Sequence, residues 1–122
     1  MKINLFNKDT EFVNYPAGQV VFREGDEGDN MFAVIDGTVD IIIKGNVVEK
    51  IGAGGVFGEM ALIESRPRVA SAVVTTDAKL VAVDRRRFEF LVQQNPYFAL
   101  QIMSIMAARL RKMDETLTPF ES

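Results

Sequence analysis

Residues 39–44, which read Val-Asp-Ile-Ile-Ile-Lys, indicate the fold class more directly than any other stretch of this sequence. The branched apolar side chains favour an extended strand, and their loose alternation with Asp and Lys is typical of a strand with one face toward a core. Gly45 and Asn46 follow, and this pair predicts a tight turn into a second strand over residues 47–51. The stretch therefore predicts a β-hairpin.

Short apolar runs of the same kind lie on both sides of this hairpin and are separated by glycine, proline and acidic residues. Many short strands at close spacing are typical of a sandwich or a jelly roll. We therefore expect an antiparallel, jelly-roll-like β-roll of about eight short strands over residues 10–83. The flanking runs are residues 20–22, 31–35, 69–75 and 79–83.

The last third of the chain changes to a helical pattern. Asp84 is a suitable N-cap for a helix over residues 85–94, and Pro96 suits the first position of a second helix. From Phe98 onward the apolar residues recur at helical spacing, up to residue 117. The expected fold class is therefore α+β, with a single domain over residues 1–122 that ends in two helices.

The composition of the 122-residue chain restricts its chemistry. The chain has no cysteine and no histidine, so thiol nucleophiles, thiolate metal sites and the commonest general base are all absent. Its net charge of −3 argues against a nucleic-acid-binding domain. The N-terminus lacks the features of a signal peptide, and the longest apolar stretch, residues 97–108, is interrupted by Gln101 and Ser104. We expect a cytoplasmic protein that is not an enzyme, does not enter a membrane and needs no cofactor or metal.

The stretch with the most informative chemistry is residues 57–71. Gly58 allows the backbone to approach a ligand, and the residues after it favour one short helical turn. Glu59 offers a carboxylate that suits hydroxyl groups, whereas Arg68, held behind Pro67, offers the forked donors that suit a phosphate. These residues together predict a site for a sugar phosphate. A structural ion pair between Glu59 and Arg68 is the alternative interpretation.

This stretch closely resembles the phosphate-binding cassette of cyclic-nucleotide-binding domains, as found in protein kinase A regulatory subunits, catabolite activator proteins and nucleotide-gated channels. Residues 22–29 are similar to the glycine-and-acid turn of that family, and residues 31–39 are similar to its next hairpin. The two helices after Asp84 resemble its hinge and lid helices. The resemblance covers residues 10–117, and it implies the same β-roll fold with a short helix in the cassette.

The resemblance implies a role for each cassette residue. Glu59 would bind the ribose 2′-hydroxyl and Arg68 the exocyclic oxygens of the cyclic phosphate. The backbone amides of Ala61 and Val69 would complete the phosphate cradle, and Gly58 would permit the close approach. The full set of expected ligand-binding residues is Gly58, Glu59, Met60, Ala61, Arg68, Val69 and Ala70.

The resemblance also places a base pocket. Ile41 and Val48 fall where the family lines the purine with apolar side chains, and Met113 and Asp114 fall where the lid reaches the base. Family members that prefer cGMP often carry threonine directly after the cassette arginine, and this chain has Val69 there. Because valine offers no hydroxyl, the sequence favours cAMP over cGMP. Asp114 leaves the choice open, since a carboxylate can accept from guanine or from the adenine amino group.

The function that these residues imply is a stand-alone cyclic-nucleotide sensor. Binding would draw residues 58–71 inward, and the C-terminal helix would close over the base and pass the signal to an unidentified effector protein. The chain would be a monomer, or a homodimer through the apolar helix over residues 96–117. A regulatory domain cut from a larger channel, kinase or transcription regulator is a further alternative.

Three other functions fit the sequence less well. A β-roll that has lost nucleotide binding and serves as an interaction module is disfavoured because Glu59 and Arg68 are both present. A cupin-type enzyme uses histidine metal ligands, which this chain lacks. A transcription regulator is disfavoured by the acidic balance and by the lack of a DNA-binding helix pair.

Two charged stretches also have a simpler structural interpretation. The acidic residues 24–29 lack the spacing of an EF-hand calcium loop, so they favour a turn. The basic residues 85–87 favour a solvated first helical turn over a nucleic-acid-binding patch.

Overall fold

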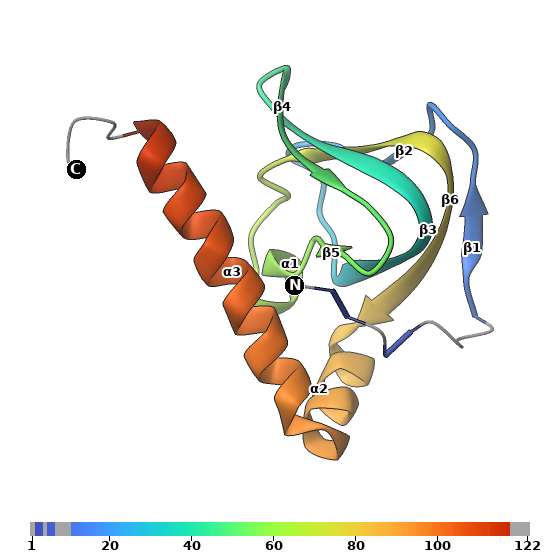
Figure 1. The fold of residues 1–122 in the computed structure, drawn as a ribbon, viewed down its shortest axis with the longest axis vertical. Coiled ribbons are helices and arrows are strands. Elements are labelled where there is room, and N and C mark those ends of the chain that lie inside the picture. Colours follow the sequence, from blue (N-terminus) through green and yellow to red (C-terminus); the bar gives the residue numbers. More distant parts are fainter. Residues whose placement is uncertain (1, 4, 7–10, 118–122) are drawn as a thin grey trace.

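The computed structural model of the chain describes residues 2–3, 5–6 and 11–117, and the side chains of residues 113–117 lie outside that description. Within the described residues, six antiparallel strands form one curved sheet with the order β1-β6-β3-β4, while β2 pairs with β6 and β5 pairs with β3 (Figure 1). The strands are Val13–Tyr15 (β1), Val20–Phe22 (β2), Asn30–Ile43 (β3), Asn46–Ile51 (β4), Val56–Phe57 (β5) and Ser71–Asp84 (β6). This arrangement confirms the predicted antiparallel β-roll.

Two long strands, β3 and β6, replace four of the short strands that the sequence predicts. The expected breaks at residues 36–38 and 76–78 are bends, where the pairing of β3 with β6 shifts its register but continues on both sides. The chain thus curves through each bend without leaving the ladder, and each 14-residue strand serves both halves of the roll. For this reason the structure describes six strands, where the sequence predicts about eight.

The turn between β3 and β4 lies one residue earlier than the sequence predicts. Its two central residues are Lys44 and Gly45, with φ angles of 51° and 80°, and Asn46 is already paired with Ile43 at the start of β4. Positive φ at both central positions is what a two-residue hairpin turn needs to match the twist of its strands. The Lys44 amide donates to the carboxylate of Glu24 at 2.6 Å, which helps to hold this turn.

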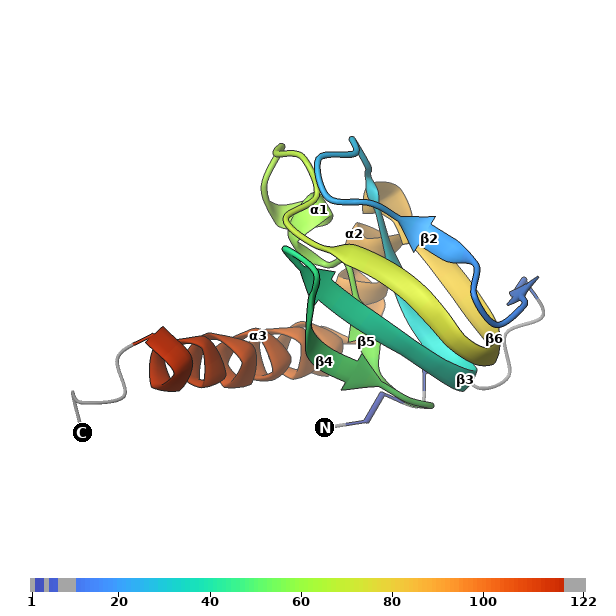
Figure 2. The ribbon, with the colours of Figure 1, turned by 90° about the horizontal axis from the view of Figure 1, so that it is seen from above.

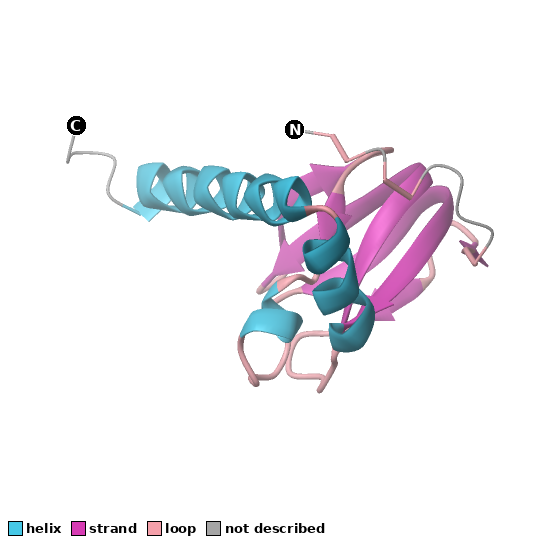
Figure 3. Ribbon diagram, turned by 90° about the horizontal axis from the view of Figure 1, so that it is seen from below, coloured by secondary structure: helices cyan, strands magenta, loops and turns pink. Residues whose placement is uncertain are grey.

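Three helices lie close together on one side of the sheet (Figure 3). The cassette contains the short α1 (Met60–Ile63), and α2 (Arg85–Gln94) and α3 (Pro96–Leu117) follow β6. Asp84 caps α2 as predicted, because its carboxylate accepts from the Arg87 amide at 2.8 Å. Pro96 is the first residue of α3, also as predicted.

The C-terminal half of α3 extends beyond the roll (Figures 1 and 2). Within the described residues, no helix is long and apolar enough to cross a membrane.

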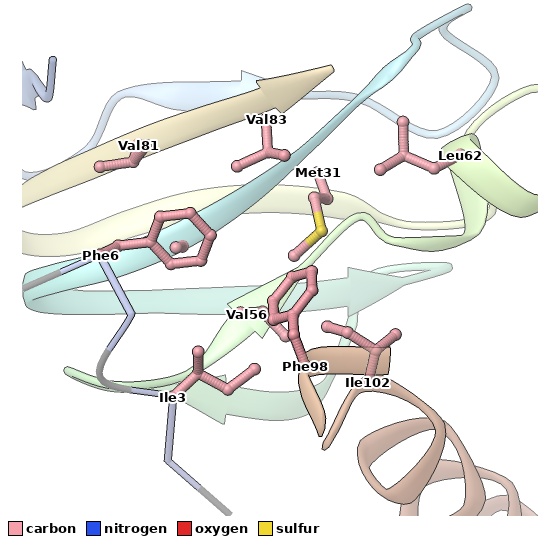
Figure 4. Close-up of a cluster of buried hydrophobic side chains, with 10 residues drawn as sticks. Ile3, Phe6, Met31, Val56, Leu62, Val81, Val83, Phe98 and Ile102 are labelled. Carbon is pink, nitrogen blue, oxygen red and sulfur yellow. The ribbon is translucent and has the colours of Figure 1, made fainter. Parts of the chain in front are cut away.

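The buried apolar residues form two clusters, one on each side of the central strands. The first lies between the roll and the helices, where Phe98 and Ile102 of α3 meet Met31 of β3 and Val56 of β5 (Figure 4). The second lies inside the roll, where Phe32 and Phe57 stack with their ring centroids 5.3 Å apart. The cassette follows directly from β5, which contributes to both clusters, so its base is fixed by the core.

Candidate functional site

The cassette begins where β5 ends. Phe57 pairs with Phe32 on β3, Gly58 turns the chain with φ of 78°, and Glu59 precedes the first residue of α1. A Cβ atom at Gly58 would lie 2.9 Å from Nη1 of Arg68, so both the backbone conformation and the space favour glycine here. The structure thus brings Gly58, Glu59 and Arg68 close together, and their role in binding a ligand stays a prediction.

Arg68 is held by backbone carbonyls and by an aromatic ring. Its Nη1 donates to the carbonyl oxygen of Gly58 at 3.1 Å, and its Nη2 donates to that of Asn30 at 2.7 Å. The guanidinium lies over the ring of Phe22, 4.0 Å from the centroid. These contacts fix the plane of the guanidinium, and none of them neutralises its charge. Neither Phe22 nor Asn30 is predicted from the sequence to be part of the site.

The charge of Arg68 is only partly compensated by its surroundings. Burial lowers the pKa of Arg68 below its ordinary value, and the nearby charges of Asp29, Asp26 and Glu59 offset this lowering only in part. Its Nε atom is buried and has no hydrogen-bond partner among the described residues. A buried cationic donor without an acceptor is unfavourable, and an anion at this place would remove the deficit.

The acidic turn between β2 and β3 is attached to Arg68 through the backbone. The Gly25 amide donates to the Arg68 carbonyl and the Arg68 amide donates to the Asp26 carbonyl, both at 2.8 Å. Farther along the turn, Gly28 passes so close that an added Cβ would lie 2.6 Å from both Nε and Nη2 of Arg68. This turn is therefore a support for the cassette arginine. Within the described residues, no group of three or more acidic, histidine or cysteine side chains could hold a metal ion.

Glu59 is buried, with 4% of its surface exposed, and its partner is an arginine that the sequence analysis did not identify. Its Oε1 accepts a hydrogen bond from Nη1 of Arg109 on α3. Arg109 also donates from Nε to Oε1 of Glu49 on β4 at 2.8 Å and from Nη2 to Oε2 of Glu49 at 3.3 Å. Nη2 further donates to the carbonyl oxygen of Val56. One guanidinium thus joins the cassette, strand β4 and the C-terminal helix.

The two carboxylates outweigh the cost of burying the charge of Arg109. Burial alone would lower the pKa of Arg109, but the charge of Glu59 and the hydrogen bonds and charge of Glu49 outweigh it and raise the pKa above its ordinary value. A signal for this contact exists in the sequence. Arg109 follows Ile102 and Ile105 at seven and four positions, so it shares the face of α3 that packs on the core. A cation on an apolar helix face predicts a buried counter-charge.

The remaining predicted ligand residues lie around the cassette with different exposures. Val69 is 67% exposed, Met60 is 39% exposed and Ala70 is buried. The Ala61 amide donates to the Gly58 carbonyl at 3.2 Å, which closes the first turn of α1. A phosphate that used this amide would have to compete with that long hydrogen bond.

Two of the four predicted base-pocket residues are described with their side chains. Ile41 is partly buried and packs against the cluster inside the roll, and Val48 on β4 is 40% exposed. Met113 and Asp114 belong to α3, but their side chains lie outside the described part of the chain. Their predicted contact with the base therefore stays a prediction.

A groove separates part of α3 from the sheet. The helix side of this groove includes Ile105 and Arg109, and the sheet side includes Glu49, Ile51 and Val56. Neither Arg68 nor Glu59 lines it. The groove is therefore a feature separate from the cassette, and Glu49 and Arg109 lie at the place where the two features meet.

The fold and the cassette together define a β-roll that presents an arginine and a buried glutamate suited to a sugar phosphate. The family model of the cyclic nucleotide-binding domain matches residues 12–95 of this chain. The chain belongs to the cyclic nucleotide-binding domain family.

Several known regulators share this fold. A CRP-like cAMP-activated global transcriptional regulator of Mycobacterium tuberculosis is 29% identical over 120 residues, which cover 94% of this chain and 54% of that protein. The catabolite activator protein of Thermus thermophilus has a TM-score of 0.78 and 33% identity over 87% of this chain and 53% of its own. The c-di-GMP-responsive global regulator CLP of Xanthomonas campestris also has a TM-score of 0.78, with 27% identity over 96% and 63% of the two chains. This chain spans about half the length of the first two proteins.

Proposed function

We propose that this chain is a sensor that binds a cyclic mononucleotide, prefers cAMP to cGMP and catalyses no reaction. The observation that carries the proposal is the state of Arg68, whose guanidinium is oriented by two carbonyls and a ring while its buried Nε has no partner among the described residues. A cyclic phosphate supplies the missing anion. Membership of the cyclic nucleotide-binding family supports this assignment.

The neighbouring carboxylate supports a ribose next to that phosphate. Glu59 uses only Oε1 in its contact with Arg109, so Oε2 can accept from the ribose 2′-hydroxyl. The phosphate would lie between Arg68 and the start of α1, with the Ala61 and Val69 amides beside it. Glycine at position 58 leaves room for the Arg68 guanidinium, since a Cβ atom there would lie 2.9 Å from Nη1 of Arg68.

The preference for cAMP rests on Val69 and on the named relative. Val69 follows the cassette arginine, is largely exposed beside the cassette and has no hydroxyl to offer to a guanine amino group. The similar protein of Mycobacterium tuberculosis is a cAMP-activated regulator. The c-di-GMP-responsive regulator of similar fold makes a cyclic dinucleotide the competing ligand.

The output of the sensor is a change in the position of α3. Arg109 already connects Glu59 of the cassette with this helix, so a ligand that recruits Glu59 alters a contact of the helix. An unidentified effector protein would read the change. The predicted cytoplasmic location and the absence of nucleic-acid binding by this chain stay predictions.

A homodimer through α3 is the second proposal. Leu100, Met103, Ala107 and Leu110 are exposed and follow the alternating three- and four-residue spacing of a coiled-coil seam. Such a seam is self-complementary in a two-fold dimer, so a second copy of this chain is the occupant that fits it. Light scattering of the purified protein tests this proposal: a dimer mass that Leu110→Glu reduces to a monomer supports it, and a monomeric wild type contradicts it.

The binding proposal is tested by calorimetric titration of the purified chain after bound nucleotide has been removed. We expect saturable binding of cAMP, weaker binding of cGMP and none of cyclic di-GMP. Arg68→Ala should weaken the binding of cAMP by about a hundredfold, because it removes the charged donors that face the phosphate.

Arg66→Ala is the matched control for this titration. Arg66 lies two residues from Arg68 in the same loop, but its side chain is 79% exposed and pairs with Glu64. We expect its affinity to equal that of the wild type. A folded, empty protein that binds neither cAMP nor cGMP would contradict the sensor and favour the interaction module. Tighter binding of cGMP, or of the cyclic dinucleotide, would overturn the assigned ligand.

A further inference from the structure

Among the residues of α3 whose side chains are described, those packed against the core reach no farther than Met106. Phe98 and Ile102 are buried, and Ile105 and Met106 are partly buried against the same cluster. Farther along, Leu110 is 63% exposed, and its neighbours Arg111 and Lys112 are exposed as well. The groove described above lies between this part of the helix and strands β4 and β5. The position of residues 107–112 therefore depends on contacts other than core packing.

Arg109 bridges the sheet and the helix at this point, and Glu49 is the partner that contacts it at two points. Glu49 receives Nε and Nη2 of Arg109 on its two carboxylate oxygens, at 2.8 and 3.3 Å. Glu59 contributes a single oxygen to a single donor, Nη1. A two-point contact between a carboxylate and a guanidinium fixes orientation as well as distance, whereas a one-point contact allows rotation. The side chains of Arg109 and Glu49 are 26% and 32% exposed, so solvent weakens this pair only in part.

The register of β4 brings Glu49 next to the predicted base pocket. A bulge between β3 and β4 leaves Val48 without a paired residue and sets Glu49 opposite Ile41. Ile41 and Val48 are the two residues predicted to line the purine from the sheet. Bulges next to binding sites commonly redirect a side chain, and here the redirected strand carries the carboxylate that holds the helix.

We propose that Glu49 is the positioning residue of the lid helix: through its two-point contact with Arg109, it sets where α3 crosses the sheet. This inference rests on the proposed nucleotide sensor and assigns different roles to the two carboxylates that contact Arg109. Glu59 is the exchangeable partner, which can turn from Arg109 to a ribose hydroxyl. Glu49 keeps Arg109 in place during that exchange, so that α3 stays attached to β4 at this point while the rest of the helix changes its position.

The test compares Glu49→Gln with the wild type in two measurements. Amide hydrogen exchange of residues 107–112 in the nucleotide-free protein reports the docking of the helix, and calorimetric titration with cAMP reports affinity. Because the substitution removes the charge of one partner in a partly buried pair, we expect exchange about fivefold faster and cAMP binding about fivefold weaker. Glu64→Gln is the matched control, since it breaks the exposed pair with Arg66 at 3.2 Å and leaves Arg109 untouched.

A double-mutant cycle with Arg109→Gln separates positioning from a general loss of stability. If Glu49 acts through Arg109, Glu49→Gln has no further effect on exchange or affinity in the Arg109→Gln background. Losses that add fully in the double variant would overturn the proposal. Exchange of residues 107–112 and affinity that both stay within twofold of the wild type in Glu49→Gln would overturn it as well.

Failure of the sensor itself gives a different result. If the wild type binds no cyclic nucleotide, the proposed function is wrong, and the exchange measurements alone decide the role of Glu49 in positioning α3. Faster exchange that depends on Arg109 then supports the positioning role, and unchanged exchange contradicts it. If the wild type binds cAMP but Glu49→Gln leaves exchange and affinity unchanged, the proposed sensor is supported and the positioning role of Glu49 is contradicted.

Discussion

Arg68 and Arg109 both belong to the site, but they differ in how far neighbouring carboxylates compensate the charge of the guanidinium. Arg68 lies on a loop and contacts two carbonyl oxygens and an aromatic ring. Arg109 lies on a helix and contacts two carboxylates. Burial with incomplete compensation lowers the pKa of Arg68, whereas the two carboxylates outweigh burial and raise the pKa of Arg109. The guanidinium of Arg68 is thus positioned to bind an anion, whereas that of Arg109 is already paired with carboxylates of the protein.

This difference separates binding from architecture. A cation whose charge is compensated inside the protein cannot be removed without leaving its counter-charges unpaired, and it attracts a further anion only weakly. A cation that is oriented and left with a free donor contributes little to the fold and offers its charge to an anion. Substitutions that affect only one of the two arginines should therefore separate stability from affinity.

The largest effect on stability is expected from Arg109→Met. This substitution leaves Glu59 buried without its counter-charge, and we expect the free energy of unfolding to fall by about 2 kcal/mol, less than for a fully buried pair because Arg109 is 26% exposed. Arg68→Met should change it by less than about 1 kcal/mol, because the guanidinium that it removes is poorly compensated. Urea unfolding of both nucleotide-free variants measures the two values. A larger loss in Arg68→Met would reverse the comparison.

An intermediate effect, on affinity alone, is expected from Gly28→Ala. The added Cβ would lie 2.6 Å from Nε and Nη2 of Arg68 and would displace the flexible end of that side chain. We expect cAMP binding to weaken about tenfold, or about 1.4 kcal/mol, with little change in the melting temperature. Gly52→Ala is the matched control, because nothing lies within 4 Å of its added Cβ. Equal affinities of the two variants would show that the plane of Arg68 is not critical.

The smallest effect is expected from Phe22→Leu, which removes the ring beneath the Arg68 guanidinium. A cation–π contact of this kind contributes about 0.5–1 kcal/mol, so we expect cAMP binding to weaken about threefold. Phe12→Leu is the control, since its ring faces the amine of Lys79 at 5.0 Å instead of the cassette. Titration of both variants with cAMP gives the comparison, and an equal loss in Phe12→Leu would point to a general effect on folding.

Residues that are close in the sequence could be predicted together. Gly58, Glu59 and Arg68 lie in one loop, and the types and order of its residues predict a sugar-phosphate site before any fold is known. The cap of α2 at Asp84 was predictable for the same reason, because a capping side chain bonds an amide three residues away. Such local features are predictable because the short chain segment between the residues keeps them close together in space.

Contacts between distant residues could not be predicted in the same way. Arg109 and Glu59 are 50 positions apart, and Arg109 and Glu49 are 60 apart, so their contact depends on how α3 crosses the sheet. The continuity of β3 and β6 through their bends was missed because a polar or glycine-containing segment reads as a break, although the ladder resumes beyond it. The exact turn at Lys44 depends on the twist of its strands, which residue types alone leave open.

The pairing of β3 with β6 has a consequence for the way this chain reaches its folded state. The two strands are the centre of the sheet, yet residues 44–70 separate them along the chain. On the ribosome, the sheet cannot assemble until synthesis has passed Asp84, whereas the β3–β4 hairpin can form earlier. Non-local pairing of this kind slows folding, so we expect refolding in roughly milliseconds to seconds. During that interval the edge of β3 that pairs with β6 is unpaired, and we expect the nascent chain to be more prone to aggregation than the folded protein.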